Sequence, residues 1–224
     1  MERGASTSGL NRWADAQIVV SGVSFVAFAL LATAAQARPY FSWDLWLARW
    51  IQKVGGLGPL MRLISVPGYG LRAMMLTSFT TLALWLTRHK REAFFLALST
   101  GIGALLDELA KAIVARPRPA TVLVTVTHHL SDPSFPSGHV VFYCSYFGFL
   151  IGLAYLGRKR APRSSRLAMV LAAIPIVLVG ISRVYLGAHW PSDVLGSYLL
   201  CAAWLPLLFL AYRRAMERWA PDAG

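Results

Sequence analysis

The sequence predicts an all-α integral membrane protein: a six-transmembrane-helix bundle with an interfacial amphipathic helix between spans one and two. Hydrophobic residues make up 56% of the 224 residues and charged residues only 14%, whereas soluble domains carry roughly 25% charged residues. Six apolar stretches come close to the length needed to cross a bilayer, and the charges gather in the short segments between them. This composition disfavours a soluble protein with one large core.

The six predicted spans follow from the length of the apolar stretches. A bilayer core requires about 20 mostly apolar residues per helix. The second and fifth stretches have the least defined edges. The spans run about from Ile18 to Ala35, Leu71 to Leu86, Ala93 to Ala115, His139 to Leu156, Leu167 to Ile181 and Asp193 to Tyr212. We expect one membrane-embedded domain over residues 1–224, with residues 1–17 as a cytoplasmic tail.

The segment from Arg38 to Gly70 is richer in Trp, Gly and Pro than the spans. Its Trp43, Trp46 and Trp50 recur near helical spacing. Aromatic side chains prefer the membrane interface, which favours an amphipathic helix lying in that plane. A folded loop packed on the bundle is the alternative.

The first span also has an alternative interpretation. The small residues of Ala35-Gln36-Ala37 resemble the cleavage site of a secretory signal. However, the polar stretch before the span is long and contains Glu2 and Asp15, and the apolar run exceeds the usual signal length. We therefore expect a retained helix.

Basic residues in short loops predict the orientation, because they mark the cytoplasmic side. The basic residues that give the net charge of +12 lie in loops between apolar runs. This pattern does not indicate a nucleic-acid-binding face. With six spans, three basic clusters lie on the side of the N-terminus, so the loops after spans one, three and five face outward. The clusters are Arg88, Lys90 and Arg91; Arg158, Lys159, Arg160, Arg163 and Arg166; and Arg213, Arg214 and Arg218. Separately, Cys144 and Cys201 lie inside apolar runs, and we interpret them as small core residues.

Polar residues with the chemistry of a phosphate site gather in two of the outward loops. Charges at membrane depth are costly, and they usually serve a function. Lys supplies a point charge and Arg a planar fork, and both suit phosphate oxygens. The residues are Lys111, Arg116-Pro117-Arg118-Pro119, Pro136-Ser137-Gly138-His139, Ser182-Arg183, His189 and Asp193.

The local sequence gives several of these residues a specific geometry. The helix of span three is expected to end at Arg116, which precedes a proline, so that Arg118 folds back towards Lys111. Ser137, Gly138 and His139 stand at a helix start, where free N–H groups favour an anion. His189 and Asp193 are four residues apart, so the carboxylate is expected to accept one ring proton and leave the other nitrogen as a free lone pair.

The three segments together resemble the type 2 phosphatidic acid phosphatase superfamily. The pattern is Lys, six residues, Arg-Pro; then Pro-Ser-Gly-His; then Ser-Arg, five residues, His, three residues, Asp. No position departs from it, and the motifs extend from Lys111 to Asp193. The resemblance implies a membrane lipid phosphatase, similar to the bacterial members that act on undecaprenyl pyrophosphate or phosphatidylglycerol phosphate; phosphatidic acid and lipid A phosphates are other family substrates.

The resemblance also implies a role for each residue. His189 is the nucleophile that forms a phosphohistidine, oriented by Asp193, and His139 protonates the leaving oxygen and then activates water. Phosphate oxygens are bound by Lys111, Arg118, Arg183, Ser137 and the N–H groups near Gly138. No metal or cofactor is expected, and the partners are the lipid phosphate and membrane lipids. The implied location is the bacterial cytoplasmic membrane, with the active site facing the periplasm or exterior.

Two other functions share the same residues. A non-hydrolytic lipid-headgroup binding or transport protein would need the cations without the nucleophile, and a vanadate-dependent peroxidase would keep the pocket without six spans.

The sequence does not assign a single role to several neighbouring residues. His128-His129 could contact substrate, bind metal or be solvated. Asp107-Glu108 could pair with Lys111 or Arg118 and hold them in place, or serve helix packing or an ion pair elsewhere. Tyr185 and Trp190 are interpreted as interfacial anchors or as part of the lipid entrance.

Overall fold

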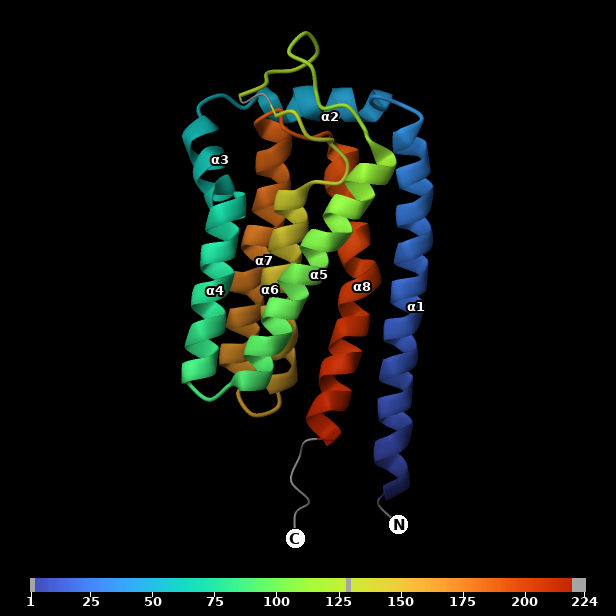
Figure 1. Cartoon of the computed structure of the whole chain (residues 1–224), viewed down its shortest axis with the longest axis vertical. Helices are drawn as coiled ribbons and strands as arrows, with labels where there is room; N and C mark the ends of the chain where they lie inside the picture. Colours follow the sequence, from blue (N-terminus) through green and yellow to red (C-terminus); the bar gives the residue numbers. More distant parts are fainter. Residues whose placement is uncertain (1–2, 128–129, 219–224) are drawn as a thin grey trace.

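In the computed structural model, which describes residues 3–127 and 130–218, the chain is an elongated bundle of helices (Figure 1). No strand occurs within those ranges. The elements are α1 (Arg3–Gln36), α2 (Ser42–Gln52), α3 (Gly58–Ser65), the 3₁₀ turn η1 (Val66–Gly68), α4 (Gly70–Leu86), α5 (Lys90–Val114), α6 (Gly138–Gly157), α7 (Pro162–Tyr185) and α8 (Pro191–Arg218).

Five of these helices, α1, α5, α6, α7 and α8, are long and apolar enough to cross a membrane. The remaining expected span corresponds to α4, whose 17 residues form a shorter apolar helix. Residues 3–17, which we expected as a tail, continue the first helix. The structure is thus an all-helical, multi-pass membrane protein.

The segment between α1 and α4 differs from the single amphipathic helix expected over residues 38–70. It forms α2, α3 and η1, because Gly55, Gly56 and Pro59 interrupt the helical sequence. α2 lies across one end of the bundle (Figure 1). It buries Asp44 and Ala48, whereas its three Trp side chains are exposed.

α6 occupies the centre of the bundle and packs on α5, α7 and α8. Its buried residues, among them Val140, Val141 and Phe149, join the two largest clusters of the apolar core. α1 packs mainly along α8. Cys144 and Cys201 are buried and free, as expected for small core residues.

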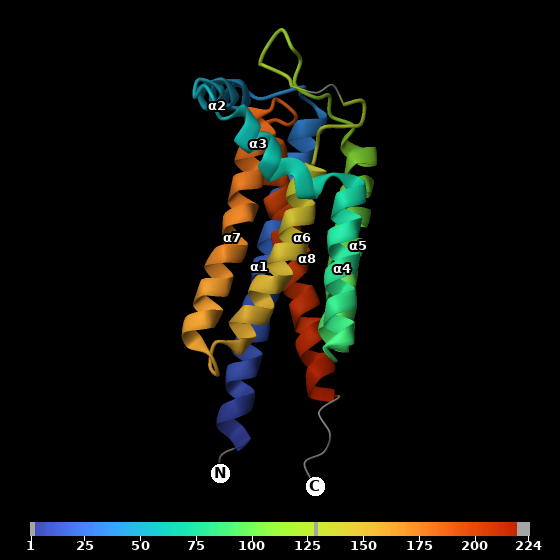
Figure 2. The same cartoon turned by 90° about the vertical axis from the view of Figure 1, so that its left-hand side faces the viewer.

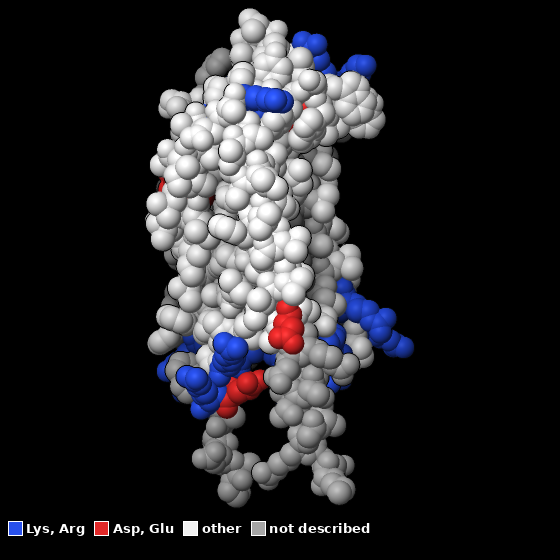
Figure 3. Space-filling view, turned by 90° about the vertical axis from the view of Figure 1, so that its right-hand side faces the viewer, with Lys and Arg blue, Asp and Glu red and all other residues white. Residues whose placement is uncertain are grey.

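The two ends of the bundle carry different chemistry. The start of α1, the end of α8 and the α4–α5 and α6–α7 turns lie at one end, and α2 with the α5–α6 and α7–α8 loops lies at the other (Figures 1 and 2). On the face shown in Figure 3, Lys and Arg side chains are concentrated towards the two ends and leave an almost uncharged middle. The basic clusters belong to the first end, and the motif residues belong to the second.

Candidate active site

The three motifs meet at the end of the bundle that carries α2. They come from the last turn of α5, the following loop, the first turn of α6, the last turn of α7 and the α7–α8 loop. Six of the expected residues line one cavity of about 620 Å³. They are Lys111, Arg118, Gly138, His139, Arg183 and His189.

Lys111 is held at the cavity by the way α5 ends. The helix stops at Val114 and Ala115 adopts a left-handed conformation, in agreement with a helix end before Pro117. The Nζ atom of Lys111 lies 2.9 Å from Asp107 and 3.7 Å from Glu108. The start of α6 packs so closely here that a Cβ at Gly138 would lie 2.8 Å from the Asp107 carboxylate and 3.3 Å from Lys111 Nζ. Only glycine permits this approach.

Arg118 folds back into the site and makes four polar contacts. Its Nη1 donates to the Ala188 carbonyl at 2.7 Å and lies 3.1 Å from His189 Nε2. Its Nε donates to the Asp132 carbonyl at 2.8 Å, and its Nη2 donates to the Asp132 carboxylate at 2.8 Å. The sequence predicted the position of Arg118 but did not identify Asp132.

The contacts of His189 define its tautomer. A guanidinium only donates hydrogen bonds, so Nε2, which faces Arg118, is the acceptor and carries a lone pair. The Nδ1 atom then carries the proton and donates it to the Ser134 carbonyl at 2.7 Å. Burial, followed by the nearby Arg118 and Arg183 charges, holds the pKa of His189 well below its usual value. The ring is therefore neutral, with an unprotonated Nε2 that Arg118 contacts at the cavity.

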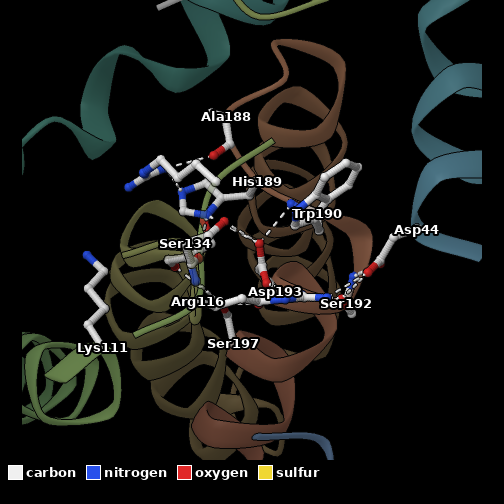
Figure 4. A network of polar contacts seen from close by, with 12 residues as sticks. Asp44, Lys111, Arg116, Ser134, Ala188, His189, Trp190, Ser192, Asp193 and Ser197 are labelled. Atoms are coloured by element: carbon white, nitrogen blue, oxygen red, sulfur yellow. Dashed lines mark hydrogen bonds and ion pairs between the residues drawn. The ribbon is translucent and has the colours of Figure 1, made fainter. Parts of the chain in front are cut away.

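The expected hydrogen bond between His189 and Asp193 is not formed. The carboxylate lies 3.9 Å from Nδ1, because its oxygens already have other partners. One oxygen accepts from the Ser134 hydroxyl at 2.5 Å and the Trp190 N–H at 2.8 Å, and the other contacts Arg116 at 2.5 Å. Asp193 thus holds the residues around His189 and does not contact its ring by a hydrogen bond (Figure 4).

Arg116 and Asp44 extend this network to α2. The sequence analysis placed Arg116 among the motif residues but gave it no role, and it did not identify Asp44. Arg116 donates to Asp44 at 3.0 Å and to the Ser192 hydroxyl at 2.7 Å, and its side chain is fully buried. Asp44 also accepts from the Ser192 N–H at 2.8 Å. Asp44 is the only acidic residue between Arg38 and Gly70. This is the one feature of the sequence that could have pointed to a special role for Asp44.

His139 and Arg183 border the cavity from the other side. The His139 ring packs edge-on against Tyr69 with centroids 4.8 Å apart. A Cβ at Gly68 would lie 2.5 Å from the His139 ring, so η1 also touches it. Arg183 is buried and its Nη1 donates to Ser65 at 3.3 Å. Elements α3 and η1 therefore complete the site.

Four buried polar atoms at the site have no hydrogen-bond partner among the residues that the structure describes. They are Ser137 Oγ, His139 Nε2, Arg183 Nε and one carboxylate oxygen of Asp107. Buried polar groups are almost always hydrogen-bonded in folded proteins. A cluster of unpaired groups beside a cavity indicates a site built for a polar ligand.

The remaining expectations have mixed outcomes. Trp190, read as an interfacial residue, is buried and packs on Tyr40 with centroids 5.2 Å apart. Tyr185 donates to the Val54 carbonyl at 2.9 Å. His128-His129 lies outside the described residues. Across the described ranges, no three His, Cys, Asp or Glu side chains converge as a metal-binding group.

Comparison with known proteins identifies the family of this arrangement. The family model described as PAP2 superfamily matches residues 92–217, a range that contains all the expected site residues. The chain is 34% identical over 116 residues to phosphatidylglycerophosphatase B of Bacillus subtilis (strain 168), covering 50% of this chain and 54% of the relative. It is 32% identical over 133 residues to undecaprenyl-diphosphatase of Sulfolobus acidocaldarius, covering 58% of this chain and 59% of the relative. The matches thus span little more than half the length of these relatives.

A solved structure extends the similarity over almost the whole bundle. It is described as the crystal structure of the first transmembrane PAP2 type phosphatidylglycerolphosphate phosphatase from Bacillus subtilis. The TM-score is 0.73 at 26% sequence identity, with 90% of this chain and 98% of that chain covered. The similarity therefore includes helices outside the region matched by the family model.

Proposed function

The chain belongs to the PAP2 superfamily, and we propose that it is a membrane phosphatase that hydrolyses a lipid phosphate ester or pyrophosphate through a phosphohistidine. One observation carries the proposal above the others. Three cations and two histidines, Lys111, Arg118, Arg183, His139 and His189, line the same cavity. A binding protein needs the cations, but it has no need of a neutral histidine whose unprotonated nitrogen faces them.

The phosphate is bound by fixed positive charge. Lys111, Arg118 and Arg183 come from three different parts of the chain, so they can surround the equatorial oxygens of a phosphoryl group. The unpaired Arg183 Nε and Ser137 hydroxyl supply further donors, together with the N–H groups at the start of α6. These groups do the electrostatic work that magnesium performs in many phosphoryl-transfer enzymes, and we propose a metal-independent reaction on that basis.

In the first step, Nε2 of His189 attacks phosphorus and the bond from phosphorus to the lipid oxygen breaks. His139 donates a proton to that departing oxygen. The hydrogen bond from Nδ1 to the Ser134 carbonyl fixes the reactive tautomer and directs Nε2 at the substrate. The products of this step are the dephosphorylated lipid and the phosphohistidine.

In the second step, water attacks phosphorus and the nitrogen–phosphorus bond breaks. His139 accepts the proton of that water, which returns it to its starting form, and inorganic phosphate leaves. Asp193 acts here as a positioning residue. It binds the Ser134 hydroxyl and the Trp190 N–H, and so it fixes both the acceptor of the His189 proton and the residue that follows His189.

The lipid part of the substrate is accommodated between α4 and α5. The cavity continues from the site along mostly small side chains of both helices. Small residues leave room for an acyl or prenyl chain that enters from the bilayer. Those residues are Ala73, Thr77 and Ser78 of α4 and Ala97, Thr100, Gly101 and Ala104 of α5.

We include α4 as the sixth membrane span. Its 17 residues measure about 26 Å at 1.5 Å per residue, close to the thickness of a bilayer core. No residue of α4 is buried, and its large apolar side chains require a lipid environment. They are Leu71, Met74, Met75, Phe79, Leu82, Trp85 and Leu86.

The basic clusters support an active site on the non-cytoplasmic side. They occupy the α4–α5 turn, the α6–α7 turn and the end of α8, and such residues mark the cytoplasmic face. The site lies at the opposite end of the bundle (Figure 1). In a bacterium this is the outer face of the cytoplasmic membrane, where α2 would lie with its exposed Trp43, Trp46 and Trp50 in the interface.

The substrate class is supported by the named relatives. Undecaprenyl diphosphate and phosphatidylglycerol phosphate are the preferred candidates, because relatives are named for each of these two activities. Both carry a terminal phosphate and a long apolar portion, which fit a cationic site joined to an apolar cavity. Phosphatidic acid and lipid A phosphates share these features and belong in the same test.

The test is phosphate release from these lipids by the purified full chain, in detergent and with a metal chelator present. The wild type should release phosphate, and the His189→Ala variant should lose nearly all turnover, by roughly 10⁴-fold or more, because it has no nucleophile. Relative rates would rank the lipids. Release of phosphate at a normal rate by His189→Ala would contradict the phosphohistidine, and no release by the wild type would favour headgroup binding or transport.

A further inference from the structure

Asp132 lies between two of the cations that we propose to bind phosphate. Its carboxylate lies 2.8 Å from Arg118 Nη2 and 3.2 Å from Lys111 Nζ, so one oxygen bridges the two cations proposed to hold substrate. The residue lines the same cavity, and its side chain is 47% exposed. An anionic group is therefore already present where the phosphoryl oxygens must go.

The bridging carboxylate leaves the two cations with little free capacity. The Nε and Nη2 atoms of Arg118 donate to Asp132, and its Nη1 contacts the Ala188 carbonyl and His189 Nε2. Lys111 has Asp107, Asp132 and Glu108 within 4 Å. A phosphate that contacts both cations must therefore displace a carboxylate, and Asp132 is the one that both of them share.

We propose that the Asp132 carboxylate occupies the phosphate site between turnovers, yields to the substrate phosphate, and returns to displace the product phosphate. This role rests on the proposed phosphatase function. A site with three cations would otherwise hold inorganic phosphate tightly at the end of each cycle. An intramolecular competitor lowers the affinity for every phosphate and thereby speeds release of the product.

The geometry allows the exchange without rearrangement of the loop. The Arg118 Nε bond goes to the backbone carbonyl of Asp132, whereas only the Nη2 bond goes to the carboxylate. Rotation of the side chain into solvent frees Nη2 and Lys111 while the backbone contact continues to position Arg118. Burial raises the pKa of Asp132, but the Arg118 and Lys111 charges outweigh it and the net pKa is lowered, so the competitor stays ionised at neutral pH.

The experiment is calorimetric titration of the purified full chain with inorganic phosphate at fixed ionic strength. Asp132→Asn should bind phosphate roughly tenfold more tightly than the wild type, because the two partly exposed ion pairs no longer compete. Glu108→Gln is the matched control. It removes the same unit charge from the neighbourhood of Lys111, but its side chain is 75% exposed and lies 3.7 Å away. Its affinity should change by less than about twofold.

Each alternative result overturns the proposal. Weaker binding by Asp132→Asn would mean that the carboxylate positions the cations, and equal tightening by Glu108→Gln would mean a general charge effect. Unchanged binding, or no binding by any of the three proteins, would show that the Asp132 carboxylate does not compete with phosphate. Lipid phosphate hydrolysis by the wild type, measured in parallel, separates this failure from failure of the proposed function, because the binding titration requires no turnover.

Discussion

Arg116 and Arg118 are two residues apart in one loop, yet their surroundings differ. Arg116 has a fully buried side chain, with Asp44, Asp193 and Ser192 as partners. Arg118 lines the cavity with 11% of its side chain exposed, and it shares the half-exposed Asp132 carboxylate with Lys111. The same residue type is thus saturated by permanent partners in one case and available to a ligand in the other.

This contrast shows that burial and partners, rather than residue type, separate positioning from substrate binding. Arg116 joins the interfacial segment α2 to Asp193, and through Asp193 to the loop that carries His189. Arg118 faces the space where a phosphoryl group would react. Changes to the two arginines should therefore affect different properties of the protein.

Arg116→Ala should have the largest effect, and on stability. The substitution leaves the Asp44 and Asp193 carboxylates buried without their cation, which costs about 3–5 kcal/mol in the free energy of unfolding. Thermal unfolding in detergent measures the loss, and activity should fall with it. A melting temperature equal to that of the wild type would show that the buried network does not hold the site together.

Arg118→Ala should have the next largest effect, and on catalysis. Loss of one donor to the transition-state phosphoryl oxygens is expected to lower kcat/KM by about 10²–10³-fold. Its melting temperature should stay close to that of the wild type, so each arginine variant serves as the control for the other. A variant that unfolds early but keeps a normal kcat/KM when folded would reverse the assignment.

The pH dependence should give the smallest effect. Desolvation of His189, reinforced by the Arg118 and Arg183 charges, favours the neutral ring and lowers its pKa well below 6.5. The nucleophile should therefore remain unprotonated as the pH falls from 8 to about 6.5, and its acid limb in kcat/KM should lie at lower pH. The profile must be corrected for ionisation of the substrate phosphate. An acid limb of His189 at or above pH 6.5 would contradict the cationic, desolvated environment.

Much of the fold could be predicted because membrane helices are encoded locally. Each expected apolar stretch corresponds to one helix, and only Ala115, at the end of the third, lies outside it. An apolar run long enough to cross a bilayer must satisfy its own backbone, which favours a helix. Residues 38–70 were less predictable. Glycine and proline break the segment into α2, α3 and η1, and which face each short helix buries depends on the bundle beneath it.

The site shows the same division. The motif spacing placed Lys111, Arg118, His139, Arg183 and His189 at one end of the bundle, and all five line the same cavity. The expected bond from His189 to Asp193 was wrong, because a spacing of four residues does not reveal competing partners. The His189 ring donates to the Ser134 carbonyl instead, and the Asp193 carboxylate accepts from Arg116.

The sequence by itself determined the membrane class, the family resemblance and the identity of the three cations and two histidines that face the cavity. These depend on local runs of apolar residues and on residue types at short fixed spacings. Only the tertiary structure decided which carboxylate meets which cation. Asp44 reaches Arg116 across 72 residues and Asp132 reaches Arg118 across 14, and such pairings are set by helix packing, because burial selects among many equally charged candidates.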